Sequence, residues 1–120
     1  AAEAGGGSIG ILPDERAQAN PYLTYALPSG IGFLRNHVVV NSGDAVIMIG
    51  GGNGTLQELT IAHDAHRPVV IMAGSGGWAD RLLPLLSDGY LDERRETVIR
   101  VGYTPREVVD IALRLAQSRR

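Results

Sequence analysis

Lysine and cysteine are the two residue types that this 120-residue sequence lacks, and all 11 of its basic side chains are arginine. Without a lysine amine, the chain cannot by itself form the Schiff base of a pyridoxal phosphate enzyme. It also cannot supply the lysine of a Walker A nucleotide loop. Without cysteine it has no disulfide, thiolate nucleophile or thiolate metal ligand. We therefore expect a cytoplasmic protein whose chemistry uses neither an amine nor a thiol.

The charge balance is weak, with a formal net charge of −2. This balance predicts neither a basic surface for nucleic acid nor one for anionic membranes. No apolar run approaches the roughly 20 residues that span a bilayer. The hydrophobic content of 44% and the charged content of 20% are ordinary for a globular protein. We expect a single domain over residues 1–120 whose partner is a small molecule.

Short apolar runs alternate with longer segments of helical period, which predicts an α/β fold with a parallel sheet and helices on both faces. The predicted strands are residues 8–12, 22–27, 45–49, 68–73 and 97–101. The predicted helices are residues 31–41, 55–66, 78–87 and 105–117, the last with Thr104 as its N-cap and Pro105 as its first residue. Residues 13–21 are rich in Pro, Asp and Asn and predict an irregular loop.

Glycines gather where the third predicted strand leads into a helix, in the sequence IGGGNGTLQE. Backbone amides at a helix N-terminus lack partners within the helix, and they can close on an anion only where side chains are absent. Thr55 can either cap this helix or donate its hydroxyl to a phosphate. The alternative is a tight turn without a ligand. The residues expected to contact a phosphate are Gly50, Gly51, Gly52, Asn53, Gly54 and Thr55.

Two further polar positions accompany this segment. Glu58 follows Thr55 by three residues, so it either completes a capping box or directs a carboxylate toward the sugar of a nucleotide. Arg35 follows a second glycine-rich turn, in the sequence SGIGFLRN. Its guanidinium suits a phosphate or a sugar hydroxyl, although most arginines lie on solvated faces.

His63, His66 and Trp78 are candidates with plainer interpretations. The two histidines are close enough in sequence to share a metal, but they lack further ligands, and charge at a helix C-terminus explains them better. Trp78 follows the glycine-rich sequence GSGG at a strand end. It either stacks on the base of a ligand or anchors its own helix.

Taken together, the pattern G-G-x-G-T-x-x-E after a strand and the upstream pair Arg35 and Asn36 resemble the Lonely Guy (LOG) family of the SLOG superfamily. These are Rossmann-like proteins long labelled lysine decarboxylases. The branch with a Gly-Gly-Gly loop is also similar to molybdenum cofactor carrier proteins. The matching segments are GILP, ANPY, SGIGFLRN, SGDAVIMIGGGNGTLQE, RPVVIM and GGW with its following helix.

The resemblance implies a hydrolase rather than a decarboxylase. Such an enzyme cleaves the N-glycosidic bond of a nucleoside 5′-monophosphate to give the base and ribose 5-phosphate. Arg35 and Glu58 would be the catalytic pair, Asn36 would contribute to ligand binding, and no metal or other cofactor would be needed. The alternative that it implies is a non-catalytic carrier of molybdenum cofactor, which is a pterin phosphate, or a sensor of a nucleotide ligand. A homodimer or larger oligomer is implied in each case.

Three departures from the hydrolase pattern accompany the resemblance. Gly50 stands where the hydrolases usually have proline, and Asn36 stands where they usually have lysine. The family's first two strand-and-helix units have no counterpart in residues 1–120, so we expect the chain to be N-terminally incomplete. Because there is no lysine, any phosphate held here has to rely on backbone amides and arginine.

Overall fold

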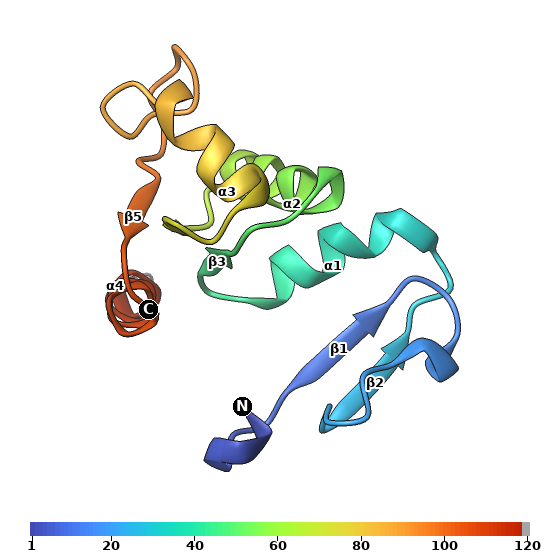
Figure 1. The fold of residues 1–120 in the computed structure, drawn as a ribbon. Helices are drawn as coiled ribbons and strands as arrows, with labels where there is room; N and C mark the ends of the chain where they lie inside the picture. The colour runs from blue at the N-terminus through green and yellow to red at the C-terminus, as the bar shows by residue number, and fades with distance from the viewer. Residues whose placement is uncertain (119–120) are drawn as a thin grey trace. The chain divides into compact units, whose positions relative to one another are not determined.

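The computed structural model describes residues 1–118 (Figure 1). The chain divides into two compact units, Ala1–Val39 and Val40–Arg120, the second of which is described as far as residue 118. Helix α1 (Arg35–Ser42) begins in the first unit and ends in the second. Each unit contains a parallel β-sheet of its own, with two strands in the first unit and three in the second. The parallel strand pairing expected from the sequence is therefore present in both units.

The first unit contains strands β1 (Ile9–Leu12) and β2 (Tyr25–Pro28), which pair in parallel. Both predicted strands are confirmed, although β2 begins three residues later than expected because an Asn20 turn occupies the intervening backbone. The Tyr22 amide donates to Asn20 Oδ1 at 2.8 Å. Residues 13–24 connect the strands with a 3-10 turn, η2 (Arg16–Gln18), in an otherwise irregular loop, as predicted.

The second unit contains strands β3 (Val46–Met48), β4 (Val69–Met72) and β5 (Arg100–Gly102), in the order β3-β4-β5 and all parallel. The central strand is buried on both faces, with Val70 and Ile71 fully inaccessible to solvent. This burial accounts for its continuous run of apolar residues, since a parallel sheet is covered by helices on both sides.

Helices cover both faces of this sheet, which confirms the predicted layering for the second unit (Figure 1). Helices α2 (Asn53–Asp64) and α3 (Gly77–Leu82) pack on one face, and α4 (Pro105–Ser118) packs on the other. Successive β4 side chains point to opposite faces of the sheet. Ile71 packs in the core formed with α2 and α3, whereas Val70 packs against α4. None of the described helices is both long and apolar enough to cross a bilayer.

Helix α4 begins as its sequence predicts. The Glu107 amide donates to Thr104 Oγ1 at 3.1 Å, and the Glu107 carboxylate accepts from the Tyr103 amide at 3.2 Å. Gly102 allows the helix to lie close to the end of β5, because a Cβ built on it would stand 2.5 Å from Val108 Cγ2. The first turn of α4 is therefore fixed both by its cap and by a glycine contact.

Helix α1 begins at Arg35 rather than at residue 31, since Gly32–Leu34 form a 3-10 turn, and α2 spans Asn53–Asp64 rather than residues 55–66. Helix α3 and strand β5 also differ from their predicted bounds. Helix α3 ends at Leu82 and continues only as the 3-10 turn η4 (Leu83–Leu85), because Pro84 has no amide to extend an α-helix. Strand β5 begins at Arg100 rather than at residue 97. Upstream of it, Val98 forms an antiparallel bridge with Tyr90 instead of joining the parallel ladder.

Candidate functional site

Three glycines carry the chain from β3 into α2. Gly50 and Gly51 have φ values of 51° and 89°, in the left-handed region that side chains rarely adopt. A Cβ on Gly51 would also overlap the side chain of Thr55. Gly52 is extended and serves as the N-cap of α2. We call residues 50–55 the glycine loop. Its first two positions require glycine on backbone grounds alone.

The N-terminus of α2 is open. Its N-cap, Gly52, makes no side-chain capping hydrogen bond, and its carbonyl accepts from the Leu56 amide at 3.1 Å. Within residues 1–118, the amides of Asn53, Gly54 and Thr55 have no acceptor. The residues at this end are exposed, except for half-buried Thr55. Unpartnered amides at the positive end of a helix dipole can bind an anion.

The position of Thr55 excludes one of the two interpretations of the pair Thr55 and Glu58, the capping box. Because α2 begins at Asn53, Thr55 is the third helical residue rather than the N-cap. The capping-box alternative for Thr55 and Glu58 is therefore wrong, as is the alternative in which the Thr55 hydroxyl caps the helix. The physical reason is that extended Gly52 starts the helix two residues earlier than the sequence suggested. Glu58 lies almost a full turn beyond Thr55 and is half-buried.

A second loop, residues 73–76, follows β4 and contacts the glycine loop. Ser75 Oγ donates to the Met72 carbonyl at 2.6 Å and accepts from the Gly50 amide at 2.9 Å. The first turn of α3 adds two bonds, from the Trp78 amide to the Gly51 carbonyl at 2.9 Å and from the Ala79 amide to the Gly50 carbonyl at 3.1 Å. Amides at the start of α3 are therefore used by the glycine loop, unlike those of α2.

Asp80 closes the second loop on itself. Its carboxylate accepts from the Gly74 amide at 2.7 Å and from the Gly76 amide at 2.8 Å. The Gly74 and Gly76 amides, which precede α3, therefore already donate to a negatively charged carboxylate. Of the two helix N-termini that meet here, the α2 end is the one that can accept an external anion.

An apolar hollow of about 240 Å³ lies at the same ends of the strands. It is lined by Ile47, Ile49, Met72, Ser75, Pro105, Val108 and Val109. Ser75 contributes the polar side chain of this lining, and its hydroxyl is already hydrogen-bonded. The hollow therefore offers no charged partner, and contacts to a phosphate would have to come from the glycine loop.

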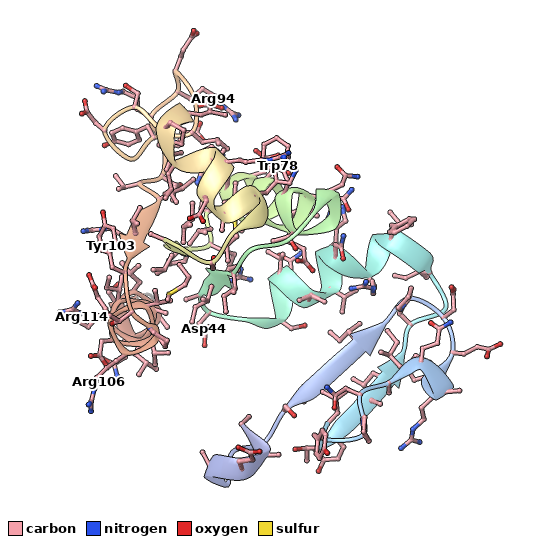
Figure 2. All side chains as sticks on the ribbon, in the orientation of Figure 1. Asp44, Trp78, Arg94, Tyr103, Arg106 and Arg114 are labelled. Atoms are coloured by element: carbon pink, nitrogen blue, oxygen red, sulfur yellow. The ribbon has the colours of Figure 1, made fainter. Side chains whose placement is uncertain are left out.

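Trp78 is the second residue of α3. Its half-buried side chain packs against the core shared by β4, α2 and α3. The Arg81 guanidinium lies 5.8 Å from the centroid of its ring. Figure 2 shows Trp78 on α3 beside α2. This packing favours the anchoring interpretation over a base-stacking one.

Arg35 and Asn36 form the first turn of α1, in the first unit, whereas Glu58 and the glycine loop belong to the second. Arg35 Nη1 donates to Asn36 Oδ1 at 3.3 Å. Arg35 Nε is buried without a hydrogen-bond partner in the described chain, and Asn36 is 3% exposed. The catalytic pair of Arg35 and Glu58 remains a prediction. A buried guanidinium nitrogen without an acceptor is a donor that an anionic ligand could use.

His63 lies in the last turn of α2 and is buried, with 2% of its surface exposed. His66 follows the helix end with a φ of 55°. Its Nδ1 lies 3.5 Å from the hydroxyl oxygen of Thr97. Residues 1–118 contain no group of three or more acidic or histidine side chains that could hold a metal ion.

Sequence reasoning missed Ser75 and Asp80. The available signal was a serine directly after a strand and an acidic residue four positions after Gly76, which suits a carboxylate that returns to loop amides at a helix start. What the sequence could not supply was the adjacency of the two loops. That adjacency comes from the parallel pairing of β3 with β4.

Fold and site together define a Rossmann-like α/β protein with a glycine loop at the carboxyl end of a parallel strand. The model of the SLOG cluster4 family matches residues 1–108, and the chain belongs to that family.

Two solved structures have the same fold. TM1055, a structural genomics target, is 42% identical with a TM-score of 0.87, covering 93% of this chain and 66% of that chain. A protein described as the molybdenum cofactor binding protein of the phototrophic bacterium Rippkaea orientalis is 24% identical with a TM-score of 0.75, covering 94% of this chain and 64% of that one.

An uncharacterized protein of Archaeoglobus fulgidus is 38% identical over 58 residues. That match covers 48% of this chain and 38% of the Archaeoglobus protein. The chain thus spans less than two thirds of the Archaeoglobus protein and 66% and 64% of the two solved chains.

Proposed function

We propose that this chain binds the phosphate group of a small phosphorylated molecule at the glycine loop and acts as a carrier rather than a hydrolase. The observation that carries the proposal is the contrast between the two helix N-termini. The Trp78 and Ala79 amides of α3 donate to the carbonyls of Gly51 and Gly50, whereas the Asn53, Gly54 and Thr55 amides of α2 have no acceptor within residues 1–118. A phosphate that caps α2 would satisfy these amides.

The ligand contacts expected at this site are three backbone amides and one hydroxyl. The amides belong to Asn53, Gly54 and Thr55, and the hydroxyl is that of Thr55. Hydrogen bonds to a charged group contribute about 1.5–3 kcal/mol each, so a few of them suffice for a measurable preference for the phosphorylated form.

Gly50 is the residue that favours a carrier. Its φ of 51° and its amide bond to Ser75 Oγ are both impossible for proline, which holds φ near −65° and has no N–H. Hydrolases of the LOG family, which the sequence resembles, usually have proline at this position. The loop of this chain therefore has a local conformation that such a proline could not adopt. The Rippkaea protein described as binding molybdenum cofactor shares the fold. That likeness supports a pterin phosphate as the cargo.

A hydrolase is the second candidate, favoured by two side chains. Glu58 lies on α2 almost a full turn beyond Thr55, and Arg35 has a buried Nε without an acceptor in the described chain. In this candidate, Arg35 orients the ribosyl phosphate. Glu58 stabilises the developing oxocarbenium ion or activates water. As the N-glycosidic bond breaks, the water oxygen bonds to C1′ and the leaving base takes up a proton, which gives the free base and ribose 5-phosphate.

Gly52 offers a direct test of phosphate binding. Its backbone is extended, and nothing lies within 4 Å of a Cβ built there. Aspartate is a preferred N-cap, so the Gly52→Asp carboxylate would cap the same amides that a phosphate needs. The free protein should gain a few tenths of a kcal/mol or more in its free energy of unfolding. Its affinity for AMP should fall by about tenfold or more, because the site then holds a negative charge of its own.

The measurement is calorimetric titration with AMP and with adenosine, beside urea unfolding of the free protein. Gly52→Asn is the matched control, because asparagine caps with the same shape but without charge and should weaken AMP binding less. Wild-type protein should prefer AMP to adenosine, and a pterin phosphate should compete for the same site. Equal binding of AMP and adenosine by the wild type would contradict the proposal. Unchanged AMP affinity in Gly52→Asp would contradict it as well.

A further inference from the structure

The Ser75 hydroxyl forms hydrogen bonds both to the end of β4 and to the start of the glycine loop. A hydroxyl has one hydrogen, and here it is given to the Met72 carbonyl at 2.6 Å. Its lone pairs are therefore left to accept the Gly50 amide at 2.9 Å. Ser75 is half-buried, so both bonds are partly shielded from competing water. The Ser75 side chain links Met72, the last residue of the central strand, to Gly50, the first residue of the glycine loop.

Helix α3 holds two carbonyls of the glycine loop. The Gly50 and Gly51 carbonyl oxygens accept from the first turn of α3, at 3.1 Å and 2.9 Å. In a planar trans peptide, the carbonyl oxygen and the N–H of the next residue point in opposite directions. All described peptide bonds are trans. The amides of Gly51 and Gly52 therefore point away from α3.

The Gly51 and Gly52 amides are two further hydrogen-bond donors beside the open amides of α2. Neither the Gly51 amide nor the Gly52 amide has an acceptor in the described part of the chain. They stand directly before the three open amides of α2. Consecutive backbone amides form a concave anion site when their peptide planes turn them toward one point, so such a site depends on the orientation of each peptide plane.

We propose that Ser75 is a positioning residue that, together with the first turn of α3, holds the glycine loop in its phosphate-binding conformation. This inference rests on the proposed function, because the ligand of the loop is the phosphate group proposed there. Ser75 contacts no ligand in this proposal. It acts through Gly50, whose left-handed backbone it holds by a single hydrogen bond.

The variants Ser75→Ala and Ser75→Thr separate this role from simple packing. Alanine removes the hydroxyl, whereas threonine keeps it. Ser75→Ala should lower the affinity for AMP roughly three- to tenfold, the effect of one hydrogen bond, and leave the affinity for adenosine unchanged. Ser75→Thr should bind AMP with an affinity close to that of the wild type. Ser118→Ala serves as a control, because it removes a hydroxyl bond to a carbonyl at the end of α4 and should leave AMP binding unaltered.

A second readout needs no ligand. Amide hydrogen exchange of the Gly50 N–H, followed by NMR on the full chain, should be faster in Ser75→Ala than in the wild type or in Ser75→Thr. If wild-type protein does not prefer AMP to adenosine, the proposed function fails, and the exchange of Gly50 still decides whether Ser75 holds the loop. Equal exchange in Ser75→Ala and wild type overturns the inference. So does faster exchange with unchanged AMP affinity.

Discussion

Gly77 lies directly against the peptide that joins Gly50 to Gly51, so that a Cβ built on Gly77 would stand 2.7 Å from the Gly51 nitrogen. Gly77 also has a φ of 53°. Real side chains do not approach a backbone this closely, and the Gly50 and Gly51 carbonyls on either side of this nitrogen are held by hydrogen bonds from α3. The start of α3 and the glycine loop therefore pack as one piece.

Gly77→Ala should destabilise the protein more than Gly74→Ala. Both glycines have positive φ, but nothing lies within 4 Å of a Cβ built on Gly74. Gly74→Ala should cost about 1 kcal/mol from backbone strain alone, and Gly77→Ala should cost that plus about 1–3 kcal/mol from overpacking. Urea unfolding measures both variants. Equal losses would mean that the loops are not packed as described.

Thr55→Val should weaken phosphate binding and preserve stability. Valine keeps the branched shape that lies against Gly51 but removes the hydroxyl, which is proposed to contact the phosphate. We expect a several-fold loss of AMP affinity at an unchanged adenosine affinity. Thr60→Val is the control on the same helix, since the Thr60 hydroxyl only donates to the Gln57 carbonyl at 2.9 Å. Comparable loss of AMP binding in both variants would argue against a ligand contact by Thr55.

The carrier proposal predicts that the protein releases no free adenine from AMP, even at enzyme concentrations that saturate the ligand. Chromatography of the reaction mixture measures the adenine. Glu58→Gln is the informative variant, because the amide is nearly isosteric but can neither stabilise an oxocarbenium ion as an anion nor accept a proton from water. Adenine release that Glu58→Gln abolishes would establish the hydrolase instead.

The pKa of Asp92 should depend on Arg94, which lies in the same exposed loop (Figure 2). The Arg94 side chain donates to the Asp92 carboxylate at 2.7 Å and 3.0 Å, and this hydrogen bonding lowers the Asp92 pKa below its ordinary value. A carboxyl whose folded pKa is lowered contributes stability above its unfolded pKa and loses it as the pH falls through the folded pKa.

Arg94→Gln should therefore move the Asp92 pKa upward, toward its ordinary value, in an NMR titration. Added salt should shift the pKa of the wild-type residue in the same direction, because the pair is exposed and its attraction is screened. A pKa unaffected by the substitution would show that the pair does not form in solution.

Several features could be predicted because they depend on neighbours in sequence. The start of α4 follows from Thr104 and Pro105, since a cap and a fixed φ act within one turn. The burial of β4 follows from its unbroken apolar run. The glycine loop was recognisable because four glycines in five residues leave a strand and enter a helix.

For other features, sequence reasoning led to a wrong or an undecided prediction at single residues. The Thr55–Glu58 spacing fits a capping box, yet α2 starts at Asn53, and a shift of two residues removes the box. Trp78 was open to two interpretations, and its packing against a core built from four other elements favours one of them. Local sequence carries both possibilities equally, because only distant contacts distinguish them.

By itself, the sequence determined the parallel α/β class, the position of the glycine loop and the absence of any lysine for the proposed phosphate site. Only the tertiary structure decided which helix end is open. Both α2 and α3 follow glycine-rich segments, and their sequences alone do not tell them apart. The pairing of β3 with β4 brings the two loops together, so that the carbonyls of Gly50 and Gly51 and the carboxylate of Asp80 occupy amides at and before the start of α3. The first three amides of α2 have no acceptor within residues 1–118, because hydrogen-bond partners are set by proximity in space and not in sequence.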